Sequence, residues 1–489
     1  MVGMVIIRHV TLLTTLLLSF AVAANIQYLD SLQVVELVVN NSTRVELARI
    51  NLALAKSEIP ASLYPFDWNL SVNIGQKSEH LPSASIYENQ SYRQSTFGPS
   101  VGATRLFQNG VELDMSIQFL EYDTSSATTL FTQRKQMGAS LSLNIPLLKG
   151  RGQSVNTTDY NLALLKQEKY QAKLADRLDQ SVLKALEYLL KLYELRKEVE
   201  LKERDMEYSK SILDFDHARY KTGKLSRVDY LNSQALYQKK VGLLEVAKLK
   251  AYNQDILLQK EIFPPHIAGT TTILPKVTLT DRHPLSPFAP MDLGHLPSII
   301  VEKIGYRERQ VELFEAKNGL LPELDLEIAL SNSGLGSEAA TAFDQVATNR
   351  YFNWEVALNF SWIFGNHQAL GSVAAKQARL RKAVTTRRSL FRQKLQKWRS
   401  TRAEMKKLEE GLAQIDGQRE VAHALLEFKL EQYKLQHVSS LELAQAQQDL
   451  LKISQERNSK LVKLGQTYNQ LMALNGKLYK SPVNGDSNH

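Results

Sequence analysis

Two segments of this chain, 213 residues apart, look like copies of one turn. They run from Tyr220 to Asp229 and from Tyr433 to Glu442, and a Phe precedes each of them by five residues. Both segments lie between two long helical patterns. A turn that recurs inside two helical hairpins is typical of an internally duplicated chain. The sequence therefore predicts a repeated helical unit rather than one globular enzyme domain.

The first 24 residues are expected to be a secretion signal peptide. Arg8 and His9 precede an apolar run at 10–20, and the small residues at 21–23 suit a cleavage site. A membrane anchor is the alternative, but this run is short for a span of about 20 residues. Since no later stretch has 18 consecutive apolar residues, any membrane insertion would have to use β-strands.

Composition excludes several kinds of chemistry. The chain has no cysteine, which removes disulfides, thiolate zinc sites and a cysteine nucleophile from consideration. It carries 60 basic and 51 acidic residues, and loss of the signal peptide with Arg8 would leave a net charge of +8. We expect this excess to be spread over solvated helix surfaces rather than gathered into a nucleic-acid interface.

Several segments alternate apolar and polar residues with a period of two, as half-buried strands do. The clearest is 352–362, where Phe352 and Trp354 alternate with Asn353 and Glu355. The others are 66–75, 111–119, 138–147 and 324–330. Most of these runs are about 9–11 residues long, which fits a tilted membrane strand. A soluble β-sandwich is the alternative, and acidic residues in the middle of the strands count against it.

In a membrane sheet, the apolar face would contact lipid and the polar face would line a water-filled lumen. The aromatic residues expected to face lipid are Phe66, Trp68, Phe352, Trp354, Phe360 and Trp362. The carboxylates expected to line the lumen are Asp67, Glu112, Asp114, Asp325, Glu327 and Glu355. Such a lumen would favour the passage of cations.

Long helical patterns follow each group of strands. We expect helices over 28–58, 155–213, 227–262, 298–319, 368–434 and 440–476. At about 1.5 Å per residue, the two longest hairpin helices would reach on the order of 90–100 Å, too long for a globular domain. Their adjacent apolar stripes suit a wall of helices packed side by side.

The expected organisation follows the repeat. It comprises a signal peptide at 1–24, a first repeat at 25–262, a Pro-rich connector at 263–297, a second repeat at 298–476 and a tail at 477–489. The prolines that open the strand regions, Pro65 and Pro322, are 257 residues apart, whereas the strand exits Gly150 and Gly365 are 215 apart. The first repeat thus has 42 extra residues. An Asn-Gly pair at 109–110 indicates that they form an added hairpin or an enlarged loop.

No catalytic motif stands out, and the ten His residues form no metal-binding pattern, so we predict no enzyme activity, no metal and no cofactor. The repeated turns are the best candidate site, because turns at the ends of long hairpins are exposed. The simpler interpretation is that their Gly and Ser residues end one helix and cap the next. The candidate docking residues are Gly223, Lys224, Leu225, Ser226, Asp229, Gln436, His437, Val438, Ser439 and Glu442.

Over 28–476 the chain resembles the TolC-like outer-membrane factor family. The order of helix, strands, long helix, turn and shorter helix, given twice, carries this resemblance. The segment from Ser140 to Gly152 is similar to the family's strand-to-helix exit, and the segment from Arg219 to Leu231 to its tip motif. Asn40 and Asn41 are similar to a common feature of its first helix.

The resemblance implies a homotrimer in the outer membrane of a Gram-negative bacterium. Its protomers would share one β-barrel, continued into the periplasm by a long α-helical barrel, with the connector in the equatorial region. The tips would meet a periplasmic adaptor protein that is coupled to an inner-membrane pump of the RND or ABC type. The trimer would be a passive exit duct for efflux or type I secretion, and its cargo could be drugs, metals or proteins. A trimeric coiled-coil tether or adhesin is the alternative.

Two features depart from the family pattern. Gln436 stands where the first turn has Gly223, so the two turns would differ as docking sites. The family's usual barrel has twelve strands, four from each protomer. The 42 extra residues leave two alternatives open, a barrel of twelve strands or one of eighteen. An open strand edge is not tolerated in lipid, so either barrel requires several copies to close it.

Overall fold

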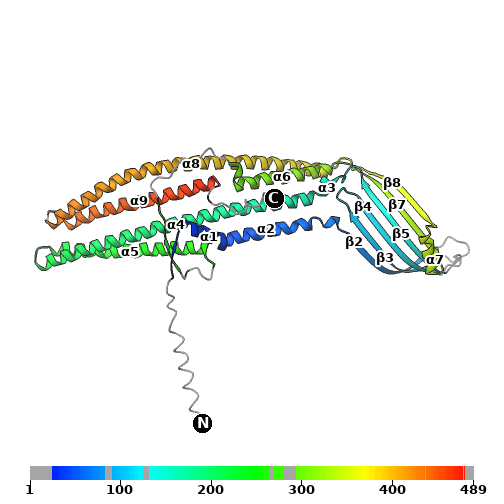
Figure 1. Ribbon diagram of the computed structural model, residues 1–489, viewed down its shortest axis with the longest axis horizontal. Helices are drawn as coiled ribbons and strands as arrows, with labels where there is room; N and C mark the ends of the chain where they lie inside the picture. The colour runs from blue at the N-terminus through cyan, green and yellow to red at the C-terminus, as the bar shows by residue number, and fades with distance from the viewer. Residues whose placement is uncertain are drawn as a thin grey trace, which may run out of the picture. The chain divides into compact units, whose positions relative to one another are not determined.

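The computed structural model describes residues 25–82, 91–124, 132–264, 269, 271–279, 293–435, 437–476 and 478. The expected signal peptide, Gln436 and nearly all of the expected tail lie outside the described residues. The described chain combines strands with long helices, as the alternating segments and long helical patterns of the sequence predict, so its fold class is α+β (Figure 1). It forms two compact units, and each takes segments from both halves of the sequence. One comprises Met1–Ile50, Ala172–Ile300 and Ser389–His489, and the other Asn51–Gln171 and Val301–Arg388.

The second of these units contains an antiparallel sheet of six strands in the order β2-β3-β4-β5-β7-β8. The strands are β2 (Asn69–Pro82), β3 (Ser91–Leu106), β4 (Glu112–Thr124), β5 (Gln133–Pro146), β7 (Glu323–Gly336) and β8 (Phe352–Ser361). Four strands come from the first half of the sequence and two from the second. Strands β3 and β4 meet at the Asn-Gly pair, where Gly110 adopts a φ of +93°. Within the described chain, β2 and β8 are the outer strands.

The register joins the alternating segments into one apolar and one polar face, because residues directly opposite each other share a face. On the apolar face, Leu141 lies opposite both Met115 and Leu330, and Leu330 lies opposite Trp354. On the polar face, Asp114 lies opposite Ser142. Ala329 of β7 lies opposite both Ser142 of β5 and Glu355 of β8. A slip of one residue would move every side chain to the other face, so this agreement across the sheet fixes the register.

The beginning of the sheet differs from the prediction. Phe66 is 8% exposed and belongs to the 3-10 helix η1 (Tyr64–Phe66), so its assignment as a lipid-facing strand residue is wrong. Asp67 follows η1 as its carboxy-terminal cap, and β2 begins two residues later. Pro65 explains the difference, since its fixed backbone angle suits the start of a helical turn and it cannot donate to a strand ladder.

Helix α7 (Ala339–Ala347) packs on the outer end of β7 and was not predicted. It can approach the strand closely because Gly334 and Gly336 have no side chain. A Cβ atom on Gly334 would lie 2.0 Å from the Ala342 carbonyl oxygen. The Asn332 amide donates to the Val346 carbonyl at 2.7 Å and fastens the end of the helix to the sheet. The sequence signal for this close packing is the pair of glycines, Gly334 and Gly336.

Helices, several of them long, make up most of the remaining described chain. They are α1 (Ser31–Asn41), α2 (Thr43–Ala61), α3 (Gln153–Asn156), α4 (Thr158–Lys221), α5 (Arg227–Ile262), α6 (Pro297–Asn318), α8 (His367–Lys434) and α9 (Ser440–Leu474). Helix α4 has no Gly or Pro over its 64 residues. Pairs three or four residues apart, such as Lys197 and Arg204 with Glu200, support its exposed surface.

In the first unit, a two-stranded parallel sheet crosses the hairpin of α4 and α5. It pairs β1 (Asn25–Leu29) with β6 (Thr271–Pro275), and η2 (Leu293–His295) follows. The helix predicted over 28–58 therefore begins later, at Ser31, and is interrupted at Ser42. The Asp255 carboxylate, 2% exposed, accepts from the Ile273 amide at 3.1 Å and from Arg196 at 3.2 Å. This buried carboxylate holds β6 against α5.

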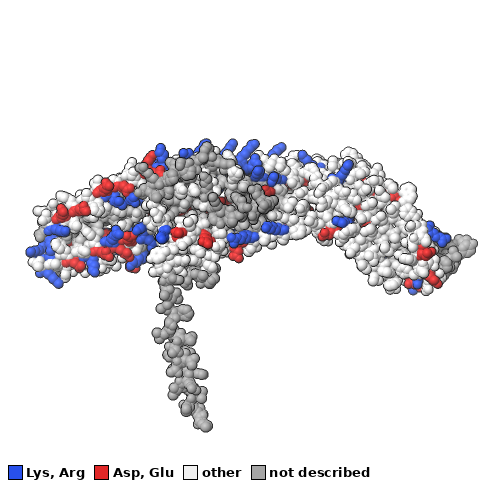
Figure 2. Space-filling model, in the orientation of Figure 1, with Lys and Arg blue, Asp and Glu red and all other residues white. Residues whose placement is uncertain are grey.

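The hydrophobic core of the first unit lies at this crossing. Leu189 and Leu192 of α4, Leu258 and Ile262 of α5 and Ile273 of β6 are fully buried in one cluster. Burial of each such side chain contributes roughly 1.5–3 kcal/mol to the free energy of unfolding. The Asn41 amide donates to the Ile262 carbonyl at 3.0 Å and satisfies the end of α5. In the other unit, the face of the sheet turned to the viewer carries few charged side chains between its ends (Figure 2).

Candidate functional site

The first turn joins α4 to α5 with a glycine cap. Gly223 adopts a φ of +74°, a left-handed conformation that favours glycine. The Lys224 amide donates to the Arg219 carbonyl at 2.9 Å, and the Gly223 amide donates to the Tyr220 carbonyl at 3.0 Å. This pair of bonds is a Schellman motif, which ends a helix by satisfying its last carbonyls. Ser226 then caps α5 by accepting from the Asp229 amide at 3.1 Å.

The second turn repeats this geometry 213 residues later. The His437 amide donates to the Gln432 carbonyl at 2.9 Å, as Lys224 does to Arg219. Ser439 caps α9 by accepting from the Glu442 amide at 3.2 Å. Gln436 lies outside the described residues, so its comparison with Gly223 stays a prediction. The other candidate docking residues lie at these two turns, where Leu225 and Val438 are half-buried and the rest are exposed.

Each turn also exposes an apolar side chain that the sequence analysis missed. Val228 is 66% exposed, and Leu441, its equivalent 213 residues later, is 77% exposed. Both lie in the first turn of the helix that follows the cap. Comparing the two copies position by position would have found them, because an exposed apolar residue at the same place in both copies points to contact with another molecule.

Close to the turns, a buried carboxylate joins the two hairpins. Asp216 of α4 is fully buried and accepts from the hydroxyls of Ser233 on α5 and Tyr433 on α8, the latter at 2.5 Å. Burial and then the hydrogen bond to Asp216 raise the pKa of the Tyr433 hydroxyl. Ile212 and Leu443 pack beside it in a small apolar cluster.

A second buried carboxylate lies farther along α4. Asp205, 3% exposed, forms an ion pair with Lys240 of α5 at 2.9 Å and accepts from the amide of Gln447 on α9 at 2.9 Å. Both partners are also buried. Because a buried charge is tolerated when it is paired and hydrogen-bonded, these two carboxylates fix how one hairpin lies against the other.

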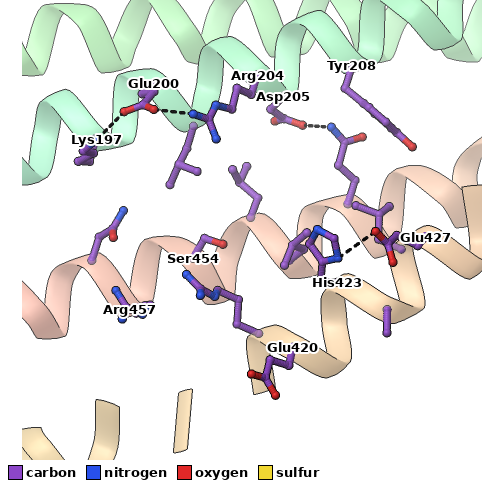
Figure 3. Close-up of a pocket in the computed structure, with 18 of the residues that line it drawn as sticks. Lys197, Glu200, Arg204, Asp205, Tyr208, Glu420, His423, Glu427, Ser454 and Arg457 are labelled. Atoms are coloured by element: carbon purple, nitrogen blue, oxygen red, sulfur yellow. Dashed lines mark hydrogen bonds and ion pairs between the residues drawn. The ribbon is translucent and has the colours of Figure 1, made fainter. Parts of the chain in front are cut away.

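A cavity of about 820 Å³ opens between α4, α8 and α9 beside Asp205 (Figure 3). Its lining holds four basic and four acidic side chains. Several are paired, including Glu200 with Lys197 at 2.7 Å and His423 with Glu427 at 3.4 Å. The cavity therefore offers no excess of either charge and indicates no ligand class.

The sheet brings the other predicted residues together. Glu112, Asp114, Asp325, Glu327 and Glu355 share its polar face by register, whereas Asp67 precedes the first strand. Trp68, Phe352, Trp354, Phe360 and Trp362 are between 46% and 70% exposed. The Arg105 guanidinium lies 5.3 Å from the centre of the Trp68 ring, at the end of the apolar face.

No helix of the described residues combines the length and apolar composition that a membrane span needs. Among the same residues, no group of three or more His, Asp or Glu side chains is placed to hold a metal ion.

No protein-family model matches the sequence, and no curated protein matches it. Solved structures do match its fold. The CmeC outer membrane channel of Campylobacter jejuni has a TM-score of 0.66 at 12% identity, over 92% of this chain and 86% of that chain. The outer membrane protein VceC of Vibrio cholerae has a TM-score of 0.66 at 13% identity, over 92% and 97%. The MtrE outer membrane channel of Neisseria gonorrhoeae has a TM-score of 0.61 at 12% identity, over 92% and 89%.

These neighbours are outer-membrane proteins, and two of them are described as channels. The likeness extends over nearly the whole chain in both directions and concerns the fold. The fold of this chain is therefore that of the TolC-like outer-membrane factors, which confirms the resemblance seen in the sequence.

The Asp216 contact gives a first test. Tyr433→Phe removes the hydroxyl that donates to Asp216 and leaves a buried carboxylate oxygen unsatisfied, so we expect a loss of about 1–3 kcal/mol in the free energy of unfolding. Tyr220→Phe is the matched control, since Tyr220 is the equivalent residue of the first turn and is 37% exposed. Chemical denaturation of the purified variants measures both. Equal effects at the two positions would contradict this role for Tyr433.

Two neighbouring carboxylates on α4 give a second test. Burial and then the charge of Asp176 raise the pKa of Asp179 to about 6. Between pH about 4 and about 6 the folded state thus binds more protons than the unfolded state, so stability falls as the pH rises. Asp179→Asn should raise the Tm at pH about 7.5 and leave it nearly unchanged at pH about 4. Asp214→Asn, an exposed position on the same helix, should change the Tm little at either pH.

Proposed function

We propose that this chain is the outer-membrane exit duct of a tripartite efflux or type I secretion system. In this proposal it is a homotrimer in the outer membrane of a Gram-negative bacterium and extends into the periplasm. A periplasmic adaptor protein connects it to an inner-membrane pump of the RND or ABC type. The protein carries out no reaction. It is a passive duct, and cargo that the pump delivers passes through it.

One observation carries the proposal: a six-stranded sheet with a continuous apolar face, a continuous polar face and two outer strands. An exposed apolar face of this extent suits lipid, and Trp354 is 70% exposed on it. The unpaired edges of β2 and β8 would each leave a row of backbone groups without partners in lipid. Pairing β8 of one copy with β2 of the next satisfies them, and three copies give a closed barrel of eighteen strands.

The polar face supports a water-filled lumen with a negative charge. One row of register partners crosses β4, β5 and β7 through Glu112, Asn144 and Glu327. The neighbouring row on the same face, two residues further along each strand, runs from Asp114 on β4 to Glu355 on β8. In a closed barrel such rows become rings of carboxylates, an arrangement that cation channels use. The Asn359 amide donates to Glu327 at 3.2 Å and orients that carboxylate.

The two turns are the proposed adaptor-docking sites. They present an exposed Val228 or Leu441 beside polar, capped helix ends. An exposed apolar residue next to polar groups is a common nucleus for a protein contact. The tether or adhesin alternative has no support among the structural neighbours, which include outer-membrane channels.

Purified protein in planar lipid bilayers tests the duct. We expect discrete channels that prefer K⁺ to Cl⁻, and a lower preference in the double variant Glu327→Gln with Glu355→Gln. The matched control is Glu121→Gln with Asp123→Asn, which removes the same charge from the opposite face of β4. Anion-selective channels, or a control with the same effect, would overturn the assignment of the polar face to the lumen. A protein that forms no channels would overturn the duct itself.

The docking sites have a separate test in cells that depend on this chain for export. Val228→Asp with Leu441→Asp places a charge at both tips, and we expect export to be lost while channel conductance in bilayers is retained. The control pair Val228→Ile with Leu441→Met keeps both tips apolar and should export normally. Resistance to a panel of drugs and metals measures export. Normal resistance in the aspartate pair would rule out docking through these residues.

A further inference from the structure

The basic residues of this chain are concentrated in one part of α8. Between His367 and Ala403 there are 11 basic and no acidic residues, whereas the rest of the chain has 49 basic and 51 acidic residues. The whole positive net charge therefore comes from this basic segment, and the expected even spread of charge is wrong. The basic residues are Lys376, Arg379, Arg381, Lys382, Arg387, Arg388, Arg392, Lys394, Lys397, Arg399 and Arg402. Figure 2 shows Lys and Arg side chains along the edge that α8 forms.

Four of these cations interact with other groups of the chain, although Arg387 and Arg402 are themselves exposed. Lys376 pairs with Glu312 at 3.0 Å, Lys394 acts on Asp176, and Arg387 and Arg402 lie over the rings of Tyr306 and Trp398. The other seven are exposed and form no ion pair with any residue that the structure describes. They are Arg379, Arg381, Lys382, Arg388, Arg392, Lys397 and Arg399. Within the part of the chain that the structure describes, this surface therefore carries positive charge that no carboxylate pairs with.

At one end of the basic segment, a groove of about 390 Å³ lies between α4, α6 and α8 within the second unit. Its cations are Lys169, Arg309, Arg379 and Lys382, and its carboxylates are Glu302 and Glu308. Glu308 pairs with Lys169 at 2.6 Å. The α6 wall is open at Gly305, where a Cβ would lie 3.9 Å from the nearest atom, the Lys169 ammonium nitrogen.

A neighbouring carboxylate of α6 is already committed to other cations. Glu312 pairs with Arg309 as well as with Lys376. Burial acts to raise the pKa of Glu312, but the hydrogen bonds from these two cations outweigh it and hold the pKa below its ordinary value. With Lys169 and Arg309 paired, Arg379 and Lys382 share the groove with one remaining carboxylate, Glu302, so its described side chains keep a net positive charge.

We propose that the basic segment of α8, with this groove, binds an extended anionic polymer of the cell envelope through carboxylate or phosphate groups. This rests on the proposed function, which places the helices in the periplasm. These seven cations span 21 residues of one helix, roughly 30 Å at about 1.5 Å per residue, which is longer than a small anion can reach. Arginine, the majority of them, binds carboxylates and phosphates through two parallel hydrogen bonds.

The surface does not fit a folded protein partner. Stable protein interfaces have an apolar centre, whereas Phe391, 45% exposed, is the sole large apolar side chain exposed between Lys376 and Arg402.

Lipid headgroups at the edge of the sheet fit poorly as well. Lys376 lies nine residues beyond the start of α8, about 14 Å at 1.5 Å per residue, which exceeds the Debye length of about 8 Å. A flexible polyanion held by charge remains the best match.

The test uses the full chain in detergent and sacculi purified from a Gram-negative bacterium, an insoluble polymer with carboxylate groups. We expect co-sedimentation that weakens as NaCl is raised. The variant Arg379→Gln, Lys382→Gln, Arg388→Gln and Arg392→Gln should bind on the order of tenfold less, because each lost cation removes a contact that releases counterions. The control variant Lys210→Gln, Lys239→Gln, Lys406→Gln and Lys407→Gln removes four exposed cations where both signs of charge are present. It should bind nearly as wild type.

Several results would overturn the proposal. These are no binding by the wild type, binding that salt does not weaken, or an equal loss in the control. Displacement by inorganic phosphate as effective as displacement by polyglutamate would indicate a site for a single anion instead. A changed K⁺/Cl⁻ preference with unchanged sacculus binding would place the cations along the lumen. The conductance of the wild type and of both variants is measured in parallel, which separates this test from that of the duct. Absent channels refute the duct. Lost binding with intact channels concerns the basic segment alone.

Discussion

Backbone hydrogen bonding at the two edges of the sheet is the constraint on which the arrangement depends. In lipid, each unpaired N–H or C=O group costs several kcal/mol, so a sheet with exposed edge strands is not stable there as a single copy. The apolar face, with Trp354 and Leu330 opposite each other, is equally unsuited to water. In the proposed duct, pairing of β2 with β8 between copies meets both requirements. Under that proposal, assembly would be a condition of folding in the membrane rather than a later step.

The helical unit depends on a different device. The two helices of the first hairpin pack through apolar residues at the crossing. Near the turns, the polar contacts between the two hairpins centre on Asp216 and Asp205. A buried carboxylate adds little net stability over an apolar residue of the same size, but it accepts a narrow set of partners and positions. This favours one alignment of two long helical surfaces that could otherwise slide along each other. The cavity beside Asp205 shows that packing there is incomplete.

Much of the sheet and of the long helices could be predicted from the sequence, because each is governed by a local period. Alternation over two residues places Glu327 and Glu355 on one face wherever the strands pair, and the register then brings them together. The ends of elements were less predictable. Phe66 continues the alternation in sequence, but Pro65 begins a helical turn there. Helix α7 depends on Gly334, whose role appears once a distant segment packs against it.

The candidate site likewise has features that could be predicted from the sequence and features that could not. The caps at Ser226 and Ser439 follow from residue type and spacing, so they could be predicted. The Asp216 contact joins residues 217 positions apart in sequence, and no local pattern indicates which of many helical carboxylates will be buried. The basic segment was overlooked for another reason. Net charge over the whole chain averages a strongly basic helix with an otherwise neutral protein, although the count along the sequence shows it directly.

The extra pair of strands has a geometric consequence. Strands about 4.8 Å apart and tilted by about 40° take up roughly 6.3 Å of circumference each, so eighteen would enclose a ring of about 110 Å and twelve a ring of about 75 Å. In the same unit, α2, α4, α6 and α8 adjoin the sheet. In the proposed trimer, twelve helices at about 9–10 Å each would also make a ring of roughly 110 Å. With six strands from each copy, the two rings would match in perimeter, and the proposed passage would need no narrowing where helices give way to strands.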